Sequence, residues 1–293
     1  MKALTVDSPG EPLQLKTVPT LSATTGSCIM KILAVEASSS TPNIIKGVAG
    51  YTIPPNFIPG GNAIGRVVAT GPDATIIQPG QLSLKFMTGN WTAGCMAIHA
   101  RPSLENCYSL DEKRLCGSPA AGGLGYSLVA LGGLRALDFK LGERLTVAPA
   151  TGTFSYATVQ VAVAMGARVV AVGHSRESLE SIRQKFPPGS LHVVPLTGDL
   201  ETDTAPLKQF GPVEAYINLS PPTTGSSTPV RSCFAALRKY GRACVMNIMG
   251  QDVAVPYALL TWNSLTIKGQ FMYERRNARL LIKLLFLSGS VCS

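Results

Sequence analysis

The turn at residues 150–156, Ala-Thr-Gly-Thr-Phe-Ser-Tyr, joins an apolar run to a helical stretch and could bind a phosphate group. Such a turn offers backbone N–H groups at a helix N-terminus, and a glycine lets the backbone approach an anion closely. Only Gly152 matches the three-glycine dinucleotide fingerprint, because Pro149 replaces one glycine and Ser155 takes the last place. The motif alone is weak, and an ordinary strand-to-helix turn is the alternative.

The segment Gly173-His174-Ser175-Arg176 follows the next apolar run and bears on the choice of cofactor. NAD sites place Asp or Glu at this point to bind the ribose 2′-OH, but here no acid occurs before Glu177. A hydroxyl and a guanidinium can bind a 2′-phosphate, which a carboxylate would repel. These residues predict NADP(H), with a solvated arginine at a helix start as the alternative.

The elements around these turns alternate between strand and helix patterns over the second half of the chain. Apolar runs predict strands at residues 143–150, 168–173, 191–196, 214–219, 242–248 and 264–272. Helical patterns fall at residues 155–166, 177–186, 230–240 and 274–287. This alternation is typical of βαβ units, so we expect a doubly wound α/β domain with a six-stranded parallel sheet.

The first hundred residues show a different rhythm, with period-two runs at 2–7, 13–18, 28–37 and 63–71 separated by Pro and Gly turns. Short strands at this spacing predict an antiparallel barrel or sandwich. An apolar, glycine-rich stretch at 120–137 is expected to form a helix joining the two parts. A chain of 293 residues is consistent with two domains.

The composition argues against several classes of partner. The net charge is +9, but the basic residues are scattered, and the densest cluster, at 275–279, opens a helical run beside Glu274. No nucleic-acid motif and no apolar run of membrane-spanning length occur, so we expect neither nucleic acid nor membrane as a partner. The seven cysteines are odd in number and form no CxxC pair, which predicts free thiols and a cytoplasmic location.

Residues 58–74, 150–175 and 265–285 resemble the medium-chain dehydrogenase/reductase superfamily, in its zinc-independent branch of quinone-oxidoreductase-like and alcohol-dehydrogenase-like proteins. The resemblance implies a shortened GroES-like catalytic domain at 1–120, a Rossmann nucleotide domain at 121–287 and a truncated tail at 288–293. It also implies a set of cofactor-binding residues at the carboxyl ends of the strands: Thr151, Gly152, Thr153, Phe154, Ser155, Ser175, Arg176, Asn218, Ser220, Asn247, Gly250, Gln270 and Phe271.

The chain departs from the metal-dependent branch of that superfamily. Ala37-Ser38-Ser39-Ser40 stands where that branch has a cysteine, and Gly61-Asn62-Ala63 stands where it has Gly-His-Glu. The four-cysteine structural lobe is also absent, so we expect no metal site. The segment between Gly80 and Asn106 and the C-terminal end are short for the superfamily. A catalytically impaired nucleotide-binding protein, acting as a sensor or partner protein, is therefore the alternative to an active enzyme.

Without a metal to polarise a simple carbonyl, a conjugated carbonyl compound or quinone is the favoured hydride acceptor. Tyr51 is the candidate proton donor, and Ser40 and Asn43 are candidates for binding the substrate oxygen. Packing of Tyr51, and turn or cap roles for the other two, are the alternatives. By resemblance we expect an NADPH-dependent oxidoreductase of small molecules in a specialised metabolite pathway. The run at 264–272 would be an edge strand able to form a homodimer.

Overall fold

The computed structural model describes residues 1–38, 40–48, 51–86, 94–112, 123–220, 228–247 and 252–288. The chain divides into two compact units, Met1–Gly125 with Ala278–Ser293, and Tyr126–Asn277. The boundaries expected from the sequence, at 120 and 287, differ from this division mainly because Ala278–Ser293 groups with the first unit.

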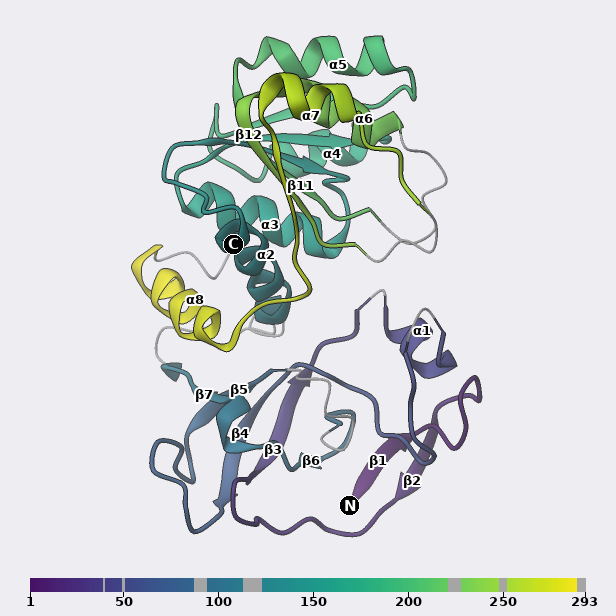
Figure 1. The fold of residues 1–293 in the computed structure, drawn as a ribbon. Helices are drawn as coiled ribbons and strands as arrows, with labels where there is room; N and C mark the ends of the chain where they lie inside the picture. Colours follow the sequence, from purple (N-terminus) through teal and green to yellow (C-terminus); the bar gives the residue numbers. More distant parts are fainter. Residues whose placement is uncertain are drawn as a thin grey trace. The chain divides into compact units, whose positions relative to one another are not determined.

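Six parallel strands form the sheet of the unit Tyr126–Asn277 (Figure 1). The order across the sheet is β10 (Leu191–Pro195), β9 (Arg168–Gly173), β8 (Arg144–Ala148), β11 (Val213–Asn218), β12 (Leu237–Val245) and β13 (Thr266–Gly269). The chain starts this sheet at β8 and adds strands outward on both sides of it, so the junction of β8 and β11 is the topological switch point. The predicted α/β class with a six-stranded parallel sheet is confirmed.

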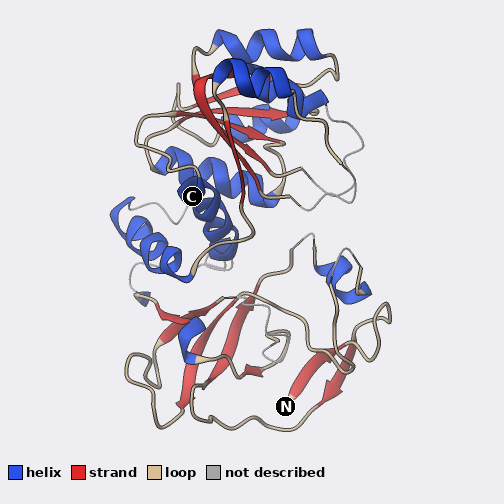
Figure 2. Ribbon diagram, viewed as in Figure 1, coloured by secondary structure: helices blue, strands red, loops and turns tan. Residues whose placement is uncertain are grey.

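Helices lie on both faces of the parallel sheet (Figure 2). They are α2 (Leu124–Ala136), α3 (Thr153–Ala164), α4 (Arg176–Arg183), α5 (Leu200–Gln209), α6 (Thr228–Ala236) and α7 (Tyr257–Asn263). Helix α8 (Arg275–Ser288) follows β13, and most of it groups with the first unit. The core of the parallel sheet includes Val172, Leu207, Tyr216 and Phe234. The helix expected at 120–137 corresponds to α2.

The helix predicted at 230–240 is wrong at its C-terminal end. α6 stops at Ala236, and residues 237–240 begin strand β12. Leu237 pairs with Val213 of β11, and a register shift follows before Arg242 pairs with Ala215. Tyr240 has a positive φ of 62° at this irregularity. Pairing with β11 therefore outweighs the helical pattern of this short polar segment.

Helix α2 packs closely against the segments that follow β12 and β13. A Cβ atom on Gly132 would collide with the backbone oxygen of Met272, and one on Gly133 would collide with the sulfur of Met246. Two adjacent glycines thus allow the helix to approach the carboxyl ends of these strands. That approach holds in place the loops that carry Asn247 and Gln270.

The first unit contains a five-stranded antiparallel sheet in the order β6 (His99–Ala100), β3 (Cys28–Val35), β4 (Ala63–Thr70), β5 (Leu82–Lys85) and β7 (Cys107–Ser109). A separate ribbon pairs β1 (Lys2–Thr5) with β2 (Gln14–Thr17), and α1 (Thr41–Lys46) follows β3. The interior holds Cys28, Met30, Val67, Ile77 and Cys107. The expected antiparallel β domain is confirmed, although β5, β6 and β7 were not predicted.

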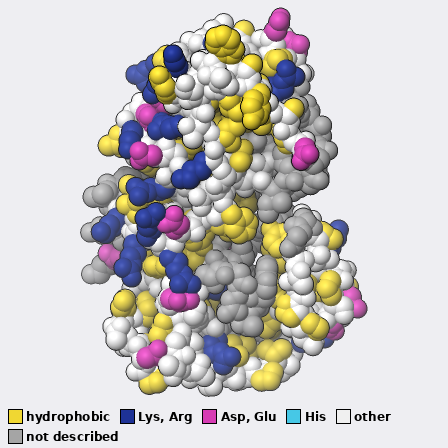
Figure 3. All heavy atoms as spheres, in the orientation of Figure 1, with side chains coloured by type: hydrophobic (Ala, Val, Ile, Leu, Met, Phe, Trp, Pro, Cys, Tyr) yellow, Lys and Arg dark blue, Asp and Glu magenta, His cyan; other side chains and the backbone are white. Residues whose placement is uncertain are grey.

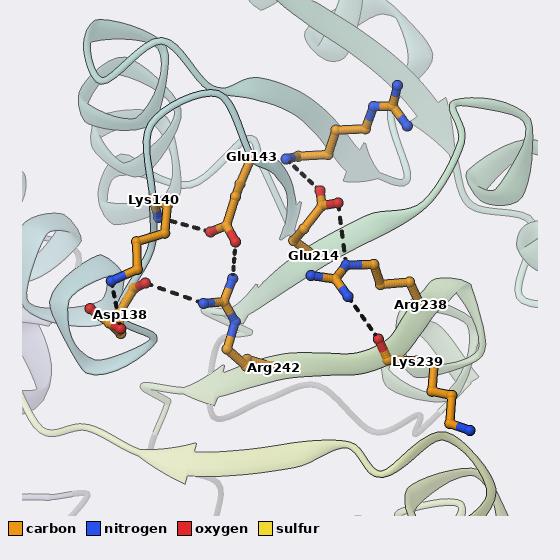
Figure 4. Close-up of polar contacts among 8 residues, drawn as sticks. Asp138, Lys140, Glu143, Glu214, Arg238, Lys239 and Arg242 are labelled. Atoms are coloured by element: carbon orange, nitrogen blue, oxygen red, sulfur yellow. Dashed lines mark hydrogen bonds and ion pairs between the residues drawn. The ribbon is translucent and has the colours of Figure 1, made fainter.

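An ion-pair network joins the amino-terminal edge of the parallel sheet (Figure 4). Arg242 of β12 donates to Glu143 at 2.6 Å and to the backbone oxygen of Asp138 at 3.2 Å. Glu214 of β11 accepts from the backbone N–H of Arg144 at 2.8 Å and lies 3.3 Å from the Arg238 guanidinium. The network therefore ties β8, β11 and β12 together at the edge opposite their carboxyl ends.

Candidate functional site

The N-terminus of α3 provides free backbone donors at the carboxyl end of β8. Gly152 is the N-cap, with extended backbone angles of φ −79° and ψ 161°, and makes no side-chain cap. The first-turn N–H groups of this 12-residue helix thus have no capping side chain. Thr151, Gly152 and Thr153 are exposed. A Cβ atom on Gly152 would lie 3.5 Å from Ser155 Oγ, an ordinary contact, so local packing does not require a glycine at this position.

Phe154 and Ser155 hold this helix start in place. The Phe154 ring meets the Tyr126 ring edge-on, with 5.0 Å between centroids, which links the turn to α2. Thr158 Oγ1 donates to the backbone oxygen of Phe154 at 2.9 Å. Ser155 is only 1% exposed. Of the predicted loop residues, the exposed Thr151, Gly152 and Thr153 are thus the ones available to a ligand.

The end of β9 lies beside this turn. A Cβ atom on Gly173 would sit 3.7 Å from Thr151 Cγ2 and 3.5 Å from Leu179 Cδ2. Ser175 is the N-cap of α4, and its Oγ accepts the backbone N–H of Ser178 at 3.1 Å. Its hydroxyl proton remains available to a second acceptor. Arg176, the first residue of α4, is exposed and forms no ion pair within the described part of the chain.

A series of backbone hydrogen bonds continues the same edge across the other strands. The N–H of Leu219 donates to Ala148 at 3.0 Å, and that of Met246 donates to Asn218 at 3.1 Å. The N–H of Gln270 donates to Val245 at 3.0 Å. The loops that carry the predicted residues of β8, β11, β12 and β13 are therefore adjacent along one edge of the sheet.

Three side chains on this edge differ in how they are satisfied. Asn218 is 2% exposed, and its Oδ1 accepts from both the backbone N–H and the hydroxyl of Ser220, at 2.9 and 2.7 Å. Asn247 Nδ2 is buried and has no hydrogen-bond partner among the described residues. This orphaned amide donor, together with the uncapped α3, fits a nicotinamide dinucleotide carrying phosphate and carboxamide acceptors.

The remaining predicted cofactor residues lie at the end of β13. Gln270 is partly buried, and its Nε2 donates to the backbone oxygen of Phe271 at 3.2 Å. The Phe271 side chain is 70% exposed. Gly250 lies outside the described residues.

In the first unit, the predicted catalytic residues cluster around α1. Ser40 is the N-cap of α1 but makes no side-chain cap, and its Oγ lies 2.6 Å from Ser38 Oγ. Asn43 lies within α1 and is partly buried. Tyr51 packs on a cluster that includes Ile44. Ser40, Asn43 and Tyr51 thus share one small region, whereas Ser39 lies outside the described residues.

The sequence analysis missed a polar pair beside this region. Asn62 Nδ2 donates to Glu36 Oε2 at 2.9 Å, and the backbone N–H of Glu36 donates to the oxygen of Asn62 at 3.0 Å. A Cβ atom on Gly125 would collide with both side chains, so the pair packs on the start of α2. One signal was available, since Glu36 is the only acid between Glu11 and Asp73.

Comparison with known proteins relates the chain to dehydrogenases. Residues 155–286 match the family described as zinc-binding dehydrogenase. A solved alcohol dehydrogenase superfamily protein from Novosphingobium aromaticivorans is similar over 98% of this chain and 85% of its own, with 20% identity and a TM-score of 0.79. The chain therefore has the fold of these dehydrogenase structures. The resemblance drawn from the residues is confirmed at the level of the fold and of the zinc-binding dehydrogenase match over residues 155–286.

Two further structures bear on the cofactor. A structure titled NAD-dependent alcohol dehydrogenase is 19% identical, with a TM-score of 0.81, and the match covers 98% of this chain and 89% of that one. The quinone oxidoreductase of Thermus thermophilus, also solved with NADPH, is 20% identical with a TM-score of 0.72, over 98% and 86%. The structural relatives thus include nicotinamide-dependent oxidoreductases of both cofactor types. No curated protein matches the chain in sequence.

The described residues contain neither a metal cluster nor a membrane-spanning helix. No group of three or more His, Cys, Asp or Glu side chains in this part of the chain is arranged to hold a metal ion. None of its helices has both the length and the apolar character needed to cross a bilayer.

Proposed function

We propose that the chain is an NADPH-dependent oxidoreductase that reduces a conjugated carbonyl compound or quinone without zinc. The observation that carries the cofactor assignment is the end of β9. There Gly173 lies beside Thr151 at the uncapped start of α3, Ser175 and Arg176 follow it in the chain, and no acid stands between Gly173 and Arg176. A guanidinium and a hydroxyl at this position favour a 2′-phosphate over a free 2′-hydroxyl.

NADPH would supply a hydride to the substrate when bound. The N–H groups that begin α3 would hold its pyrophosphate, and Arg176 would pair with the 2′-phosphate. Asn247 Nδ2, which lacks a partner among the described residues, would donate to the carboxamide oxygen. Each of these groups lies at the carboxyl edge of the parallel sheet, where open α/β folds bind their ligands.

The substrate class follows from the side chains near α1. The Ser38 and Ser40 hydroxyls are neutral donors and acceptors, which suit an enolate oxygen better than they suit zinc. An activated C=C bond accepts hydride at its β-carbon and leaves an enolate that needs only hydrogen bonds and a proton. In this proposal Tyr51 donates that proton, and Ser40 and Asn43 bind the oxygen.

The +9 charge does not alter this assignment. On the face drawn in Figure 3, acidic side chains are interspersed among the Lys and Arg side chains. A polyanion would need a continuous basic surface, so a small anionic cofactor is the better explanation. The specialised metabolite pathway and the cytoplasmic location stay predictions.

We also propose a homodimer through β13. This strand is at the edge of the sheet, and all four of its residues are exposed. Helix α7, which precedes β13 in the chain, has no buried residue, and Trp262 and Phe271 are 78% and 70% exposed. A second copy would pair its own β13 here. Light scattering should show a dimer that Ile267→Lys dissociates. Ile76→Lys replaces an isoleucine of the first unit that is 70% exposed, against 37% for Ile267, and should leave the dimer intact.

The test of the main proposal has two steps. NADPH and NADH are first titrated against the purified protein by nicotinamide fluorescence, and then conjugated enones and quinones are assayed with and without a metal chelator. NADPH preference with chelator-resistant turnover supports the proposal. Tight NADPH binding without turnover would favour the non-catalytic alternative, and binding of neither cofactor would refute the cofactor site.

A further inference from the structure

Two cysteines meet inside the first unit, although they are 79 positions apart in the chain. Cys28 Sγ and Cys107 Sγ lie 3.6 Å from each other. Both residues are buried, at 0% and 6% exposure, among the apolar side chains of Met30, Val67 and Ile77. None of the residues proposed for cofactor or substrate binding belongs to this cluster.

The backbone around the two sulfur atoms is fixed by pairing. Cys28 begins β3 and Cys107 begins β7, strands at opposite sides of the sheet with β4 and β5 between them (Figure 1). The segment that connects β6 to β7 crosses back to the start of β3. There the N–H of Cys28 donates to Pro102 at 3.1 Å, and the N–H of Leu104 donates to Gly26 at 2.9 Å. The two cysteines therefore lie at the seam that closes the sheet.

We propose that Cys28 and Cys107 are a redox-active dithiol, and that a peroxide oxidises them to a disulfide across this seam. A disulfide needs a sulfur–sulfur separation of about 2.05 Å, so the gap of 3.6 Å must close by roughly 1.5 Å. Rotation of the two side chains would have to supply that change, since the backbone on either side is held by pairing.

The reaction balances with one peroxide for each pair. The Cys28 thiolate attacks a peroxide oxygen, the O–O bond breaks, and the departing hydroxide takes up a proton to become water. Cys28 is then a sulfenic acid. The Cys107 thiolate attacks the Cys28 sulfur, the S–S bond forms, and the second oxygen leaves as water. Two thiols are oxidised, and the peroxide is reduced to two waters.

The sulfur contacts are consistent with Cys28 as the first nucleophile, since Cys107 Sγ has a second acceptor for its proton, and the pKa directions of the two thiols agree with that order. The hydrogen bond from Cys107 lowers the pKa of the Cys28 thiol, although burial opposes this. The same hydrogen bond, together with burial, raises the pKa of the Cys107 thiol. Cys107 Sγ also lies 3.4 Å from the backbone oxygen of Ser103, so its one thiol proton can be donated either to Cys28 Sγ or to this carbonyl.

The disulfide would stabilise the fold and would not take part in catalysis. The cross-link would close a loop of 79 positions that contains most of the sheet of the first unit. It would remove freedom from the unfolded chain, and the thermal midpoint of unfolding should rise by roughly 5–10 °C. Cofactor affinity should not change, because the proposed cofactor residues belong to the other unit.

The test is disulfide mapping of the folded protein. Reduced protein receives a small excess of hydrogen peroxide, free thiols are blocked with N-ethylmaleimide at low pH, and the chain is digested. Trypsin alone leaves Cys95 and Cys107 in one peptide, so a second protease must cleave after Glu105. We expect a linked peptide that joins Cys28 to Cys107 and disappears on treatment with dithiothreitol.

Two variants sharpen the result. Cys28→Ser should abolish the link and the rise in thermal midpoint, whereas Cys95→Ser, which removes another buried thiol of the same unit, should retain both. The proposal is overturned if both Cys28 and Cys107 carry maleimide after peroxide treatment of the wild type, because they were then still free thiols. It is also overturned if the linked peptide joins a different pair of cysteines. Both outcomes are read on the wild type, so they hold even where a variant fails to fold. An NADPH titration before and after oxidation tests the cofactor site separately.

Discussion

Replacing Arg176 by alanine removes the one guanidinium that the end of β9 offers to a 2′-phosphate. A hydrogen bond to a charged group contributes about 1.5–3 kcal/mol, but Arg176 is exposed, so solvent reduces its contribution to about 1–2 kcal/mol. A change of 1.4 kcal/mol is about tenfold in affinity. The dissociation constant for NADPH should therefore rise roughly 5- to 30-fold in Arg176→Ala, while that for NADH changes less than about twofold.

Arg183→Ala is the matched control, because it removes the same charge from the same helix. Arg183 lies seven residues further along α4, about 10 Å along the helix axis, and is paired with Glu180 at 2.5 Å. That separation exceeds the Debye length of about 8 Å at physiological ionic strength. Fluorescence titrations at fixed salt should show little effect on either cofactor. An equal loss of NADPH and NADH affinity in Arg176→Ala would refute the assignment of this residue to the 2′-phosphate.

The other predictions concern stability and catalysis. Arg242→Met should lower the free energy of unfolding by about 1–3 kcal/mol in urea titrations, because the Arg242 side chain is only 22% exposed and its loss leaves the Glu143 carboxylate without its ion pair. Arg276→Met removes an arginine that is 72% exposed and should change the free energy of unfolding by less than about 0.5 kcal/mol. Equal effects of the two substitutions would contradict this prediction. Tyr51→Phe should lower kcat for enone reduction by roughly 10- to 100-fold with little change in KM. Tyr240→Phe should change neither kcat nor KM. An unchanged kcat in Tyr51→Phe would remove Tyr51 from the proposed mechanism. The pKa of Asp199 is lowered because its carboxylate accepts backbone and side-chain hydrogen bonds at the start of α5, so its stabilisation is present at neutral pH and lost as the pH falls through that lowered pKa. Thermal unfolding should accordingly show a difference between wild type and Asp199→Ala that shrinks on acidification.

Much of the parallel sheet was predictable because several of its strands are continuous apolar runs between helices. Residues 168–173 and 191–196 are largely buried, and burial of this kind leaves a clear pattern. The helices α5 and α7 left no such pattern. α5 contains Pro206, and α7 is a seven-residue helix that buries nothing. Their periodicity is too short or too interrupted to detect from the sequence.

The sequence predicted only those parts of the candidate site whose positions follow directly from the ends of the predicted strands. The positions of Thr151, Ser175 and Asn218 follow from the strand ends, since the carboxyl ends of parallel strands share one edge. The pairing of Glu36 with Asn62 depends instead on an antiparallel register between β3 and β4, which includes two irregularities. Cys28 and Cys107 meet through a long connection that closes the sheet. Contacts that depend on such register and closure are decided by tertiary packing, and local patterns do not contain them.

The two edges of the parallel sheet differ in how their polar groups are satisfied, and this difference is the physical basis of the proposed site. At the amino-terminal edge, Glu143 and Glu214 are matched by Arg242 and Arg238, so the charges there neutralise one another (Figure 4). At the carboxyl edge, the described residues leave donors without acceptors: the first turn of α3, the Arg176 guanidinium and the Asn247 amide. Asn218 and Gln270 at this edge have partners, so these three groups are the unmatched donors on which the proposed site rests, and a phosphorylated dinucleotide would supply acceptors for them.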